Sequence, residues 1–77
     1  MDIKVLGPGC KNCVRLEANT RDALVALGRT ASVGKVTDIG EIVGYGVMRT
    51  PGLVVDGTVV VSGRVPSVDE IKRLLAV

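Results

Sequence analysis

A short turn between two apolar runs constrains the fold of this 77-residue chain more than any other feature. The turn is Asp56-Gly57-Thr58, and it joins residues 53–55 (LVV) to residues 59–61 (VVV). Asp-Gly favours the positive φ angles of a tight hairpin, and β-branched residues favour strands. The segment therefore predicts two antiparallel strands. Because each run is apolar on both faces, we expect both strands to be covered on both sides.

The first third of the chain predicts a strand followed by a long helix. Residues 1–6 alternate apolar and polar side chains, as a half-buried strand does, and Gly7-Pro8-Gly9 ends that pattern. Apolar residues at helical spacing then predict a helix that begins near Cys10 and runs to about Leu27. Gly28 lies where a left-handed cap ends a helix.

The remaining segments predict one more strand and two more helices. Residues 31–36 are predicted as a strand. Residues 38–45 are predicted as a short helix that begins with the capping box Asp38-Ile39-Gly40-Glu41. A second capping box, residues 67–70 (SVDE), begins the last helix. The predicted order is strand, helix, strand, helix, strand, strand, helix.

Composition excludes several classes of function. Ten basic and eight acidic residues give a net charge of +2, and Tyr45 is the only aromatic residue, so a nucleic-acid surface is not expected. No apolar run reaches the roughly 18 residues of a membrane helix, and the first residues do not resemble a secretion signal. We therefore expect a cytoplasmic protein that binds no membrane. The absence of histidine removes Ser-His-Asp and Cys-His catalysis.

The two cysteines lie together as Cys10-Lys11-Asn12-Cys13. A disulfide across so short a loop would remove only about 2 kcal/mol of unfolded-chain entropy, so a purely stabilising bridge is disfavoured. Two clustered cysteines in a small intracellular domain favour redox chemistry or metal binding.

The predicted helix gives the two cysteines different chemistry. Cys10 lies at the helix N-terminus, where free N–H groups and the helix dipole stabilise a thiolate. Cys10 is therefore expected to attack a substrate disulfide, and Cys13, one turn further and less exposed, to resolve the mixed disulfide. Glu17 and Glu41 are candidates for accepting the Cys13 proton only because they are acidic, and solvated surface is the simpler interpretation of each.

These motifs, with Thr50-Pro51 before the hairpin, resemble the thioredoxin fold. More narrowly, residues 45–51 (YGVMRTP), 54–57 (VVDG) and 63–67 (GRVPS) are similar to the small redox-active disulfide proteins of archaea and bacteria, which are thioredoxin-like and as small as glutaredoxins. The resemblance implies one domain over residues 1–77 with a βαβαββα α/β fold. It implies a four-stranded mixed sheet with helices on both faces, and a thiol–disulfide oxidoreductase.

The resemblance also implies a site beyond the cysteines. The Thr50–Pro51 peptide bond is expected to be cis and to pack beside Cys10 and Cys13, with the backbone of Thr50 pairing with an extended substrate. The implied partners are disulfide-containing proteins and an unidentified electron-donor reductase, with no cofactor and a monomeric chain. Thioredoxins carry Trp-Cys-Gly-Pro-Cys, whereas Gly9 precedes Cys10 here, so the flat aromatic contact surface is missing.

Other interpretations remain open from the sequence. A Cu(I) chaperone of the ferredoxin-like type also carries Cys-x-x-Cys, although such domains end on a strand. Structural zinc needs more ligands than two cysteines supply, and a binding module with idle cysteines is a third alternative.

Tyr45 could line the site or end a helix, Arg49 could meet an acidic partner or only solvent, and Met48 is expected to fill the core.

Overall fold

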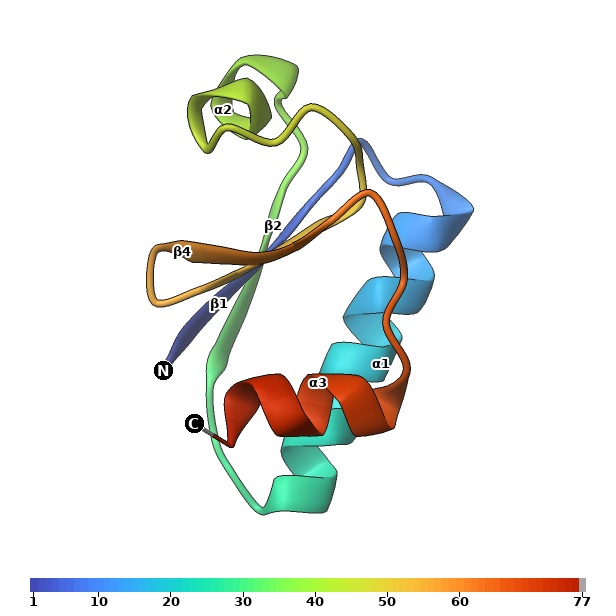
Figure 1. Cartoon of the computed structure of the whole chain (residues 1–77), viewed down its shortest axis with the longest axis vertical. Coiled ribbons are helices and arrows are strands. Elements are labelled where there is room, and N and C mark those ends of the chain that lie inside the picture. Colours follow the sequence, from blue (N-terminus) through green and yellow to red (C-terminus); the bar gives the residue numbers. More distant parts are fainter. Residues whose placement is uncertain (77) are drawn as a thin grey trace.

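Four strands and three helices follow one another, in the predicted order, in the computed structural model, which describes residues 1–76 (Figure 1). The elements are β1 (Asp2–Leu6), α1 (Lys11–Leu27), β2 (Ser32–Val36), α2 (Ile39–Gly44), β3 (Gly52–Val55), β4 (Thr58–Ser62) and α3 (Val68–Leu75). Among residues 1–76, no helix is both long enough and apolar enough to cross a membrane.

Each helix begins where a side chain accepts a hydrogen bond from a free backbone N–H. Asp38 caps α2 by accepting from the N–H of Glu41, and Ser67 caps α3 by accepting from the N–H of Glu70. Cys10 caps α1 with its sulfur. Gly28 ends α1 with φ of 64°, in the left-handed conformation that glycine adopts most easily.

The strands form one mixed sheet in the order β2-β1-β3-β4. β1 pairs with β2 in parallel and with β3 antiparallel, and β3 pairs antiparallel with β4 through the predicted hairpin. Leu6, the last residue of β1, lies opposite Gly52, the first residue of β3. The segment after β1 and the segment before β3 therefore meet at one edge of the sheet, which brings the cysteine loop to Thr50-Pro51.

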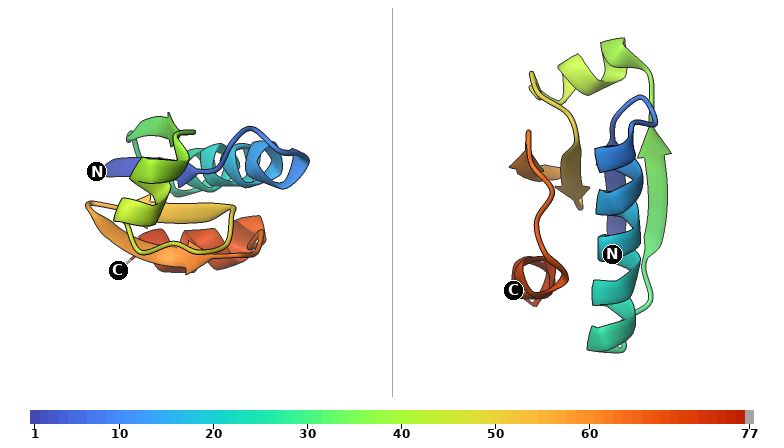
Figure 2. Two further views of the ribbon diagram at one scale, coloured as in Figure 1. Left: turned by 90° about the horizontal axis from the view of Figure 1, so that it is seen from above. Right: turned by 90° about the vertical axis from the view of Figure 1, so that its right-hand side faces the viewer.

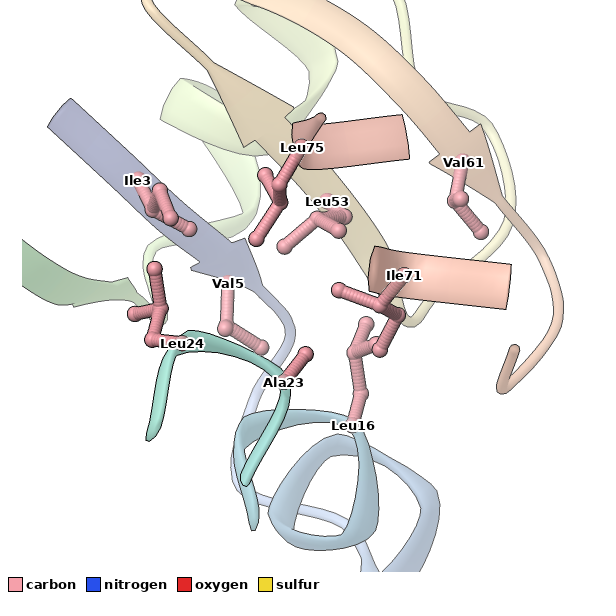
Figure 3. Close-up of a cluster of buried hydrophobic side chains, with 9 residues drawn as sticks. All are labelled: Ile3, Val5, Leu16, Ala23, Leu24, Leu53, Val61, Ile71 and Leu75. Atoms are coloured by element: carbon pink, nitrogen blue, oxygen red, sulfur yellow. The ribbon is translucent and has the colours of Figure 1, made fainter. Parts of the chain in front are cut away.

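Helices cover both faces of this sheet, as the resemblance implies. α1 and α3 cross on one face, where α3 runs across α1 (Figures 1 and 2). Side chains from these two helices and from β1, β3 and β4 form the main core (Figure 3). Its buried members are Ile3, Val5, Leu16, Ala23, Leu24, Leu53, Val61, Ile71 and Leu75.

α2 lies near one end of the sheet, at the top of Figure 1, and packs against the face opposite α1 and α3. A second buried cluster there consists of Leu6, Val36, Ile42, Val47 and Val54. Successive residues of β1 and β3 point to alternate faces, so Val5 and Leu53 enter the main core while Leu6 and Val54 enter the second cluster.

The burial expected of the hairpin is confirmed for β3 but only in part for β4, and the burial expected of Met48 is wrong. In β3, Leu53 and Val54 are buried on opposite faces of the sheet. In β4, which lies at the edge of the sheet, Val59 and Val60 are only half-buried, each packed against one of the two clusters. Met48 is 85% exposed and does not fill the core, because the neighbouring Val47 takes the inward position. The hairpin itself is confirmed, with positive φ at Asp56 and Gly57.

Candidate active site

The first cysteine lies at the exposed N-terminus of α1. Cys10 is the N-cap residue, with an extended backbone, and its Sγ accepts a hydrogen bond from the backbone N–H of Cys13 over 3.3 Å. An N–H group that donates to sulfur stabilises a thiolate, and the positive end of the helix dipole acts in the same direction. The predicted position of Cys10 at the helix start is therefore confirmed.

The second cysteine lies one turn further and is covered. Cys13 is 5% exposed, whereas Cys10 is exposed. The two sulfurs form a disulfide, and the two Cα atoms are 5.1 Å apart. The two sulfurs of the pair therefore differ in their accessibility to another molecule.

Gly7 joins the cysteine pair to the Thr50-Pro51 segment. A Cβ atom placed on Gly7 would lie 2.2 Å from the Sγ of Cys13 and 3.8 Å from the Cβ of Thr50. The sulfur therefore packs directly against the Gly7 backbone, with Thr50 on the same side. The Thr50–Pro51 peptide bond is cis, as the resemblance implies, and Pro51 is buried while Thr50 is exposed.

An apolar groove adjoins this segment. It has a volume of about 250 Å³ and runs between Pro8, Thr50 and one side of α2. Ile42 and Val47, which are buried, form part of its lining, together with the exposed side chains of Ile39, Val43 and Met48. Of the six large apolar side chains that are exposed within residues 1–76, three therefore border this one groove. We call it the α2 groove.

A much smaller recess lies on another side of Cys13. Its volume is about 20 Å³, and its lining residues are Val5, Gly7, Gly9, Cys13, Val14, Glu17, Lys35 and Thr37. Glu17 forms ion pairs with Lys35 (2.9 Å) and with Arg21 (3.0 Å). The hydrogen bond from Lys35, helped by that from Arg21, holds the pKa of Glu17 below its ordinary value, although partial burial opposes the shift.

Three other residues singled out from the sequence have their contacts with residues other than the cysteines. Glu41 borders a separate groove with Lys4 and Tyr45. Tyr45 is the half-buried C-cap of α2, and its hydroxyl accepts a hydrogen bond from Lys4 (3.3 Å). Arg49 is exposed, and its aliphatic stem packs over Gly63. Within residues 1–76, no three His, Cys, Asp or Glu side chains gather where they could hold a metal ion.

Comparisons with known proteins agree with this geometry. The family model described as "Thioredoxin domain" matches residues 1–76. A thioredoxin of Methanothermobacter thermautotrophicus is 42% identical over 76 residues, which cover 99% of both chains. A thioredoxin of Methanocaldococcus jannaschii is 41% identical over 73 residues, which cover 95% of this chain and 84% of the relative.

The chain belongs to the thioredoxin family. Membership and the Cys10–Cys13 disulfide together identify a thiol–disulfide oxidoreductase. The ferredoxin-like metal chaperone is not the fold observed, since β1 lies between β2 and β3 and the last element is a helix.

Three features of this thioredoxin-family site are absent from the sequence analysis. The close approach of Gly7 to Cys13 depends on a contact that no local pattern reveals. The pairing of Glu17 with Lys35 joins α1 to β2, and again no local pattern indicates it. The α2 groove did have a signal, because Ile39, Ile42 and Val43 are more apolar residues than a six-residue helix needs for one buried face.

Proposed function

We propose that Cys10 is the nucleophile of disulfide reduction and that Cys13 is the resolving thiol. The difference in exposure supports this assignment, since Cys10 is exposed and Cys13 is 5% exposed. The hydrogen bond from the N–H of Cys13 to the sulfur of Cys10 is the observation that carries it, because that bond favours the thiolate at position 10.

The reaction has two exchange steps. The Cys10 thiolate attacks one sulfur of a substrate disulfide, a mixed disulfide forms, and the other substrate sulfur leaves as a thiolate with the electron pair. Cys13 then loses its proton and attacks the sulfur of Cys10. The mixed disulfide breaks, the second substrate sulfur leaves reduced, and the Cys10–Cys13 disulfide remains.

Thr50 and Pro51 are proposed to dock the substrate. Thr50 is exposed and lies beside the sulfur of Cys13 across Gly7, so a strand that pairs with its backbone would place its own disulfide next to Cys10. The α2 groove begins at Thr50 and would receive an apolar side chain of the same substrate segment. Aliphatic side chains thus take the place of the aromatic surface that the sequence lacks.

The partners and the setting follow from the chemistry. Disulfide-containing proteins would be the substrates, and a separate reductase would return electrons to the Cys10–Cys13 disulfide after each turnover. We propose that the chain works as a single domain and a monomer in the cytoplasm. The reducing environment there would keep returning the cysteine pair to its dithiol form. Equilibration with a glutathione buffer would test whether the protein reduces or oxidises its substrates, since reductants such as thioredoxin have potentials of about −270 mV and strong oxidants have potentials of about −120 mV.

Replacement of each cysteine by serine tests the two roles. We expect Cys10→Ser to abolish reduction of a protein disulfide, because the nucleophile is gone. We expect Cys13→Ser to accumulate a covalent adduct with the substrate through Cys10, because nothing resolves the mixed disulfide.

Mass spectrometry of the products under non-reducing conditions would distinguish these outcomes. An adduct on Cys13 in the Cys10→Ser protein, or activity of that variant equal to that of the wild type, would reverse the assignment.

A further inference from the structure

Arg49 is an exposed cation that directly precedes Thr50, the proposed docking residue. Its aliphatic stem packs on Gly63, the residue that follows β4. A Cβ atom placed on Gly63 would lie 3.0 Å from the Cβ and 3.4 Å from the Cδ of Arg49. The side chain is therefore supported along its length, although its charged end faces solvent.

Gly63 holds this contact beside Pro51. The N–H of Gly63 donates to the carbonyl oxygen of Pro51 (2.8 Å). Gly63 has φ of 78°, which glycine adopts without strain, and its missing side chain leaves room for the stem of Arg49. Because the stem lies on Gly63 and Gly63 is bonded to Pro51, Arg49 is held next to the segment on which a substrate is proposed to dock.

The charge of Arg49 is not balanced by the chain itself. Among residues 1–76, no carboxylate lies within ion-pair distance of its guanidinium. The neighbouring arginine, Arg64, differs in this respect, because both carboxylate oxygens of Glu70 accept hydrogen bonds from it. Arginine is always charged in proteins, and its planar fork of donors matches a carboxylate. Arg49 is therefore available to a carboxylate of another molecule.

Two further cations lie on α1 shortly after Cys10. Lys11 and Arg15 are exposed, and in the part of the chain that the structure describes neither has a carboxylate within ion-pair distance. The first turn of α1 holds no acidic residue. Lys11 does not stabilise the helix, because the positive end of the helix dipole disfavours a cation there. Both segments that form the site therefore carry unbalanced positive charge.

We propose that Arg49 selects disulfides in which an acidic residue lies directly beside the cysteine, by binding that carboxylate. This inference rests on the proposed function, because it requires the substrate to pair with Thr50. A strand docked there would bring a neighbour of its cysteine to the guanidinium, since successive Cα atoms are only about 3.8 Å apart. Paired hydrogen bonds from a guanidinium to a carboxylate give specificity as well as attraction. The cations of α1 add attraction at longer range, which steers an acidic partner to the site.

Three peptide disulfides test this inference. Each is a disulfide-linked dimer of a short peptide in which the residues on both sides of cysteine are glutamate, glutamine or lysine. The fully reduced protein is mixed with each peptide, samples are quenched with acid, and chromatography of the freed peptide thiol gives a second-order rate constant. Each constant is divided by that for dithiothreitol with the same peptide, because the flanking charges also change the reactivity of the disulfide.

For the wild type, the normalised constant of the glutamate peptide should exceed that of the lysine peptide at least about fivefold at low salt, with the glutamine peptide between them. Added salt should weaken this preference, because ions screen exposed charges. Arg49→Glu should reverse the order of the glutamate and lysine peptides. Arg49→Lys should keep the order, because lysine retains the charge.

Arg73→Glu is the matched control, because it makes the same change of charge at an exposed position of α3. Arg73 borders a groove with Leu27, the last residue of α1, and so lies toward the end of that helix remote from Cys10. Its preference should stay within about twofold of that of the wild type, because screening weakens the effect of distant charges.

Two results would overturn the inference while leaving the proposed function intact. The first is equal normalised constants for the glutamate and lysine peptides with the wild type. The second is an equal change of preference in Arg49→Glu and Arg73→Glu, since net charge would then be responsible and not the position of Arg49. A wild-type protein that reduces none of the three peptides would contradict the proposed function, and the inference with it.

Discussion

The absence of a side chain at Gly7 decides how closely the disulfide can approach the sheet. Gly7 is buried directly after β1, and its N–H donates to the carbonyl oxygen of Val36 (2.9 Å), so the backbone there has little freedom to move away. The sulfur of Cys13 occupies the space that a Cβ would fill. The lack of a side chain at Gly7 therefore allows the cysteine pair to lie close to Thr50.

Gly7→Ala is expected to destabilise the oxidised protein by about 1–3 kcal/mol, the usual cost of overpacking a buried site. The new methyl carbon would lie 2.2 Å from the sulfur of Cys13, so either the disulfide or the strand end must move. Urea denaturation of the oxidised form measures the cost, and disulfide reductase activity should fall with it.

Gly34→Ala provides the control for this substitution. Gly34 lies in β2, and a Cβ there would meet no other atom within 4 Å. Its effect should be neutral or stabilising by up to about 1 kcal/mol, because alanine restricts the unfolded chain. Equal destabilisation by the two changes would show that strand backbone, and not contact with sulfur, sets the cost.

The sequence predicted well those structural features that depend only on neighbouring residues. The position of Cys10 at a helix start and the turn at Asp56-Gly57 follow from neighbouring residues alone. Met48 was misplaced because apolar character does not say which of two adjacent residues, Val47 or Met48, points inward. The cis bond at Pro51 came from the resemblance and not from local chemistry.

At the scale of elements, α2 is the short piece that shapes the site. It has six residues, fewer than an isolated helix needs to be stable in water, so it depends on its cap and on the burial of Ile42. Its other apolar side chains, Ile39 and Val43, border the α2 groove. If α2 loses its helical structure, the shape of the α2 groove should therefore change as well.

Asp38→Ala should cost about 1 kcal/mol of stability, because the N–H of Glu41 loses its acceptor. Because α2 lines the groove, we also expect KM for a protein disulfide to rise while kcat changes little. Urea denaturation and steady-state kinetics measure the two effects.

Ser67→Ala removes the corresponding cap from α3 and should cost a similar amount of stability. No residue of α3 lines the α2 groove, so this variant should keep the wild-type KM. If both variants raise KM equally, a general loss of stability is responsible and not the order of α2.

The positions at which the helices begin were predictable, because a cap depends only on neighbouring residues. The extent to which other elements bury a strand was not predictable from the sequence. Asp38 and Ser67 cap the helices that their sequence spacing predicts. The burial of β4 was overestimated because an all-valine run looks the same at the edge of a sheet as in its centre. Strand order depends on pairing between distant segments, and no local pattern in the sequence reveals it.

For the whole molecule, two ion pairs each link a helix to another segment of the chain. Glu17 links α1 to Lys35 of β2, and Glu70 of α3 pairs with Arg64 in the preceding loop. The hydrogen bonds from Lys35 and from Arg64 lower the pKa values of Glu17 and Glu70, respectively, in the folded protein. Folding is therefore coupled to the ionisation of both carboxyl groups.

Stability should decline as the solution is acidified. A carboxyl group with a lowered folded pKa contributes stability that is complete above its unfolded value, near 4.5 for Glu70, and that is lost as pH falls through the folded pKa. Urea midpoints from pH 6 to pH 2.5 should therefore decrease, and Glu70→Gln should show a smaller decrease than the wild type. The difference should be modest, since the pair is solvent-exposed and screened by salt.

Equal acid sensitivity of the wild type and Glu70→Gln would mean that the Arg64 pair contributes nothing to the pH dependence. Added salt offers a second check, because screening should reduce the difference between the two proteins.

Tyr45 gives the molecule its own optical reporter. It is the only aromatic residue in the chain, so ultraviolet emission comes from one phenol ring. That ring ends α2, packs against the second buried cluster and holds Lys4 of β1 through its hydroxyl. The emission of the oxidised and reduced protein can therefore be compared at this junction without a label and without tryptophan to mask it.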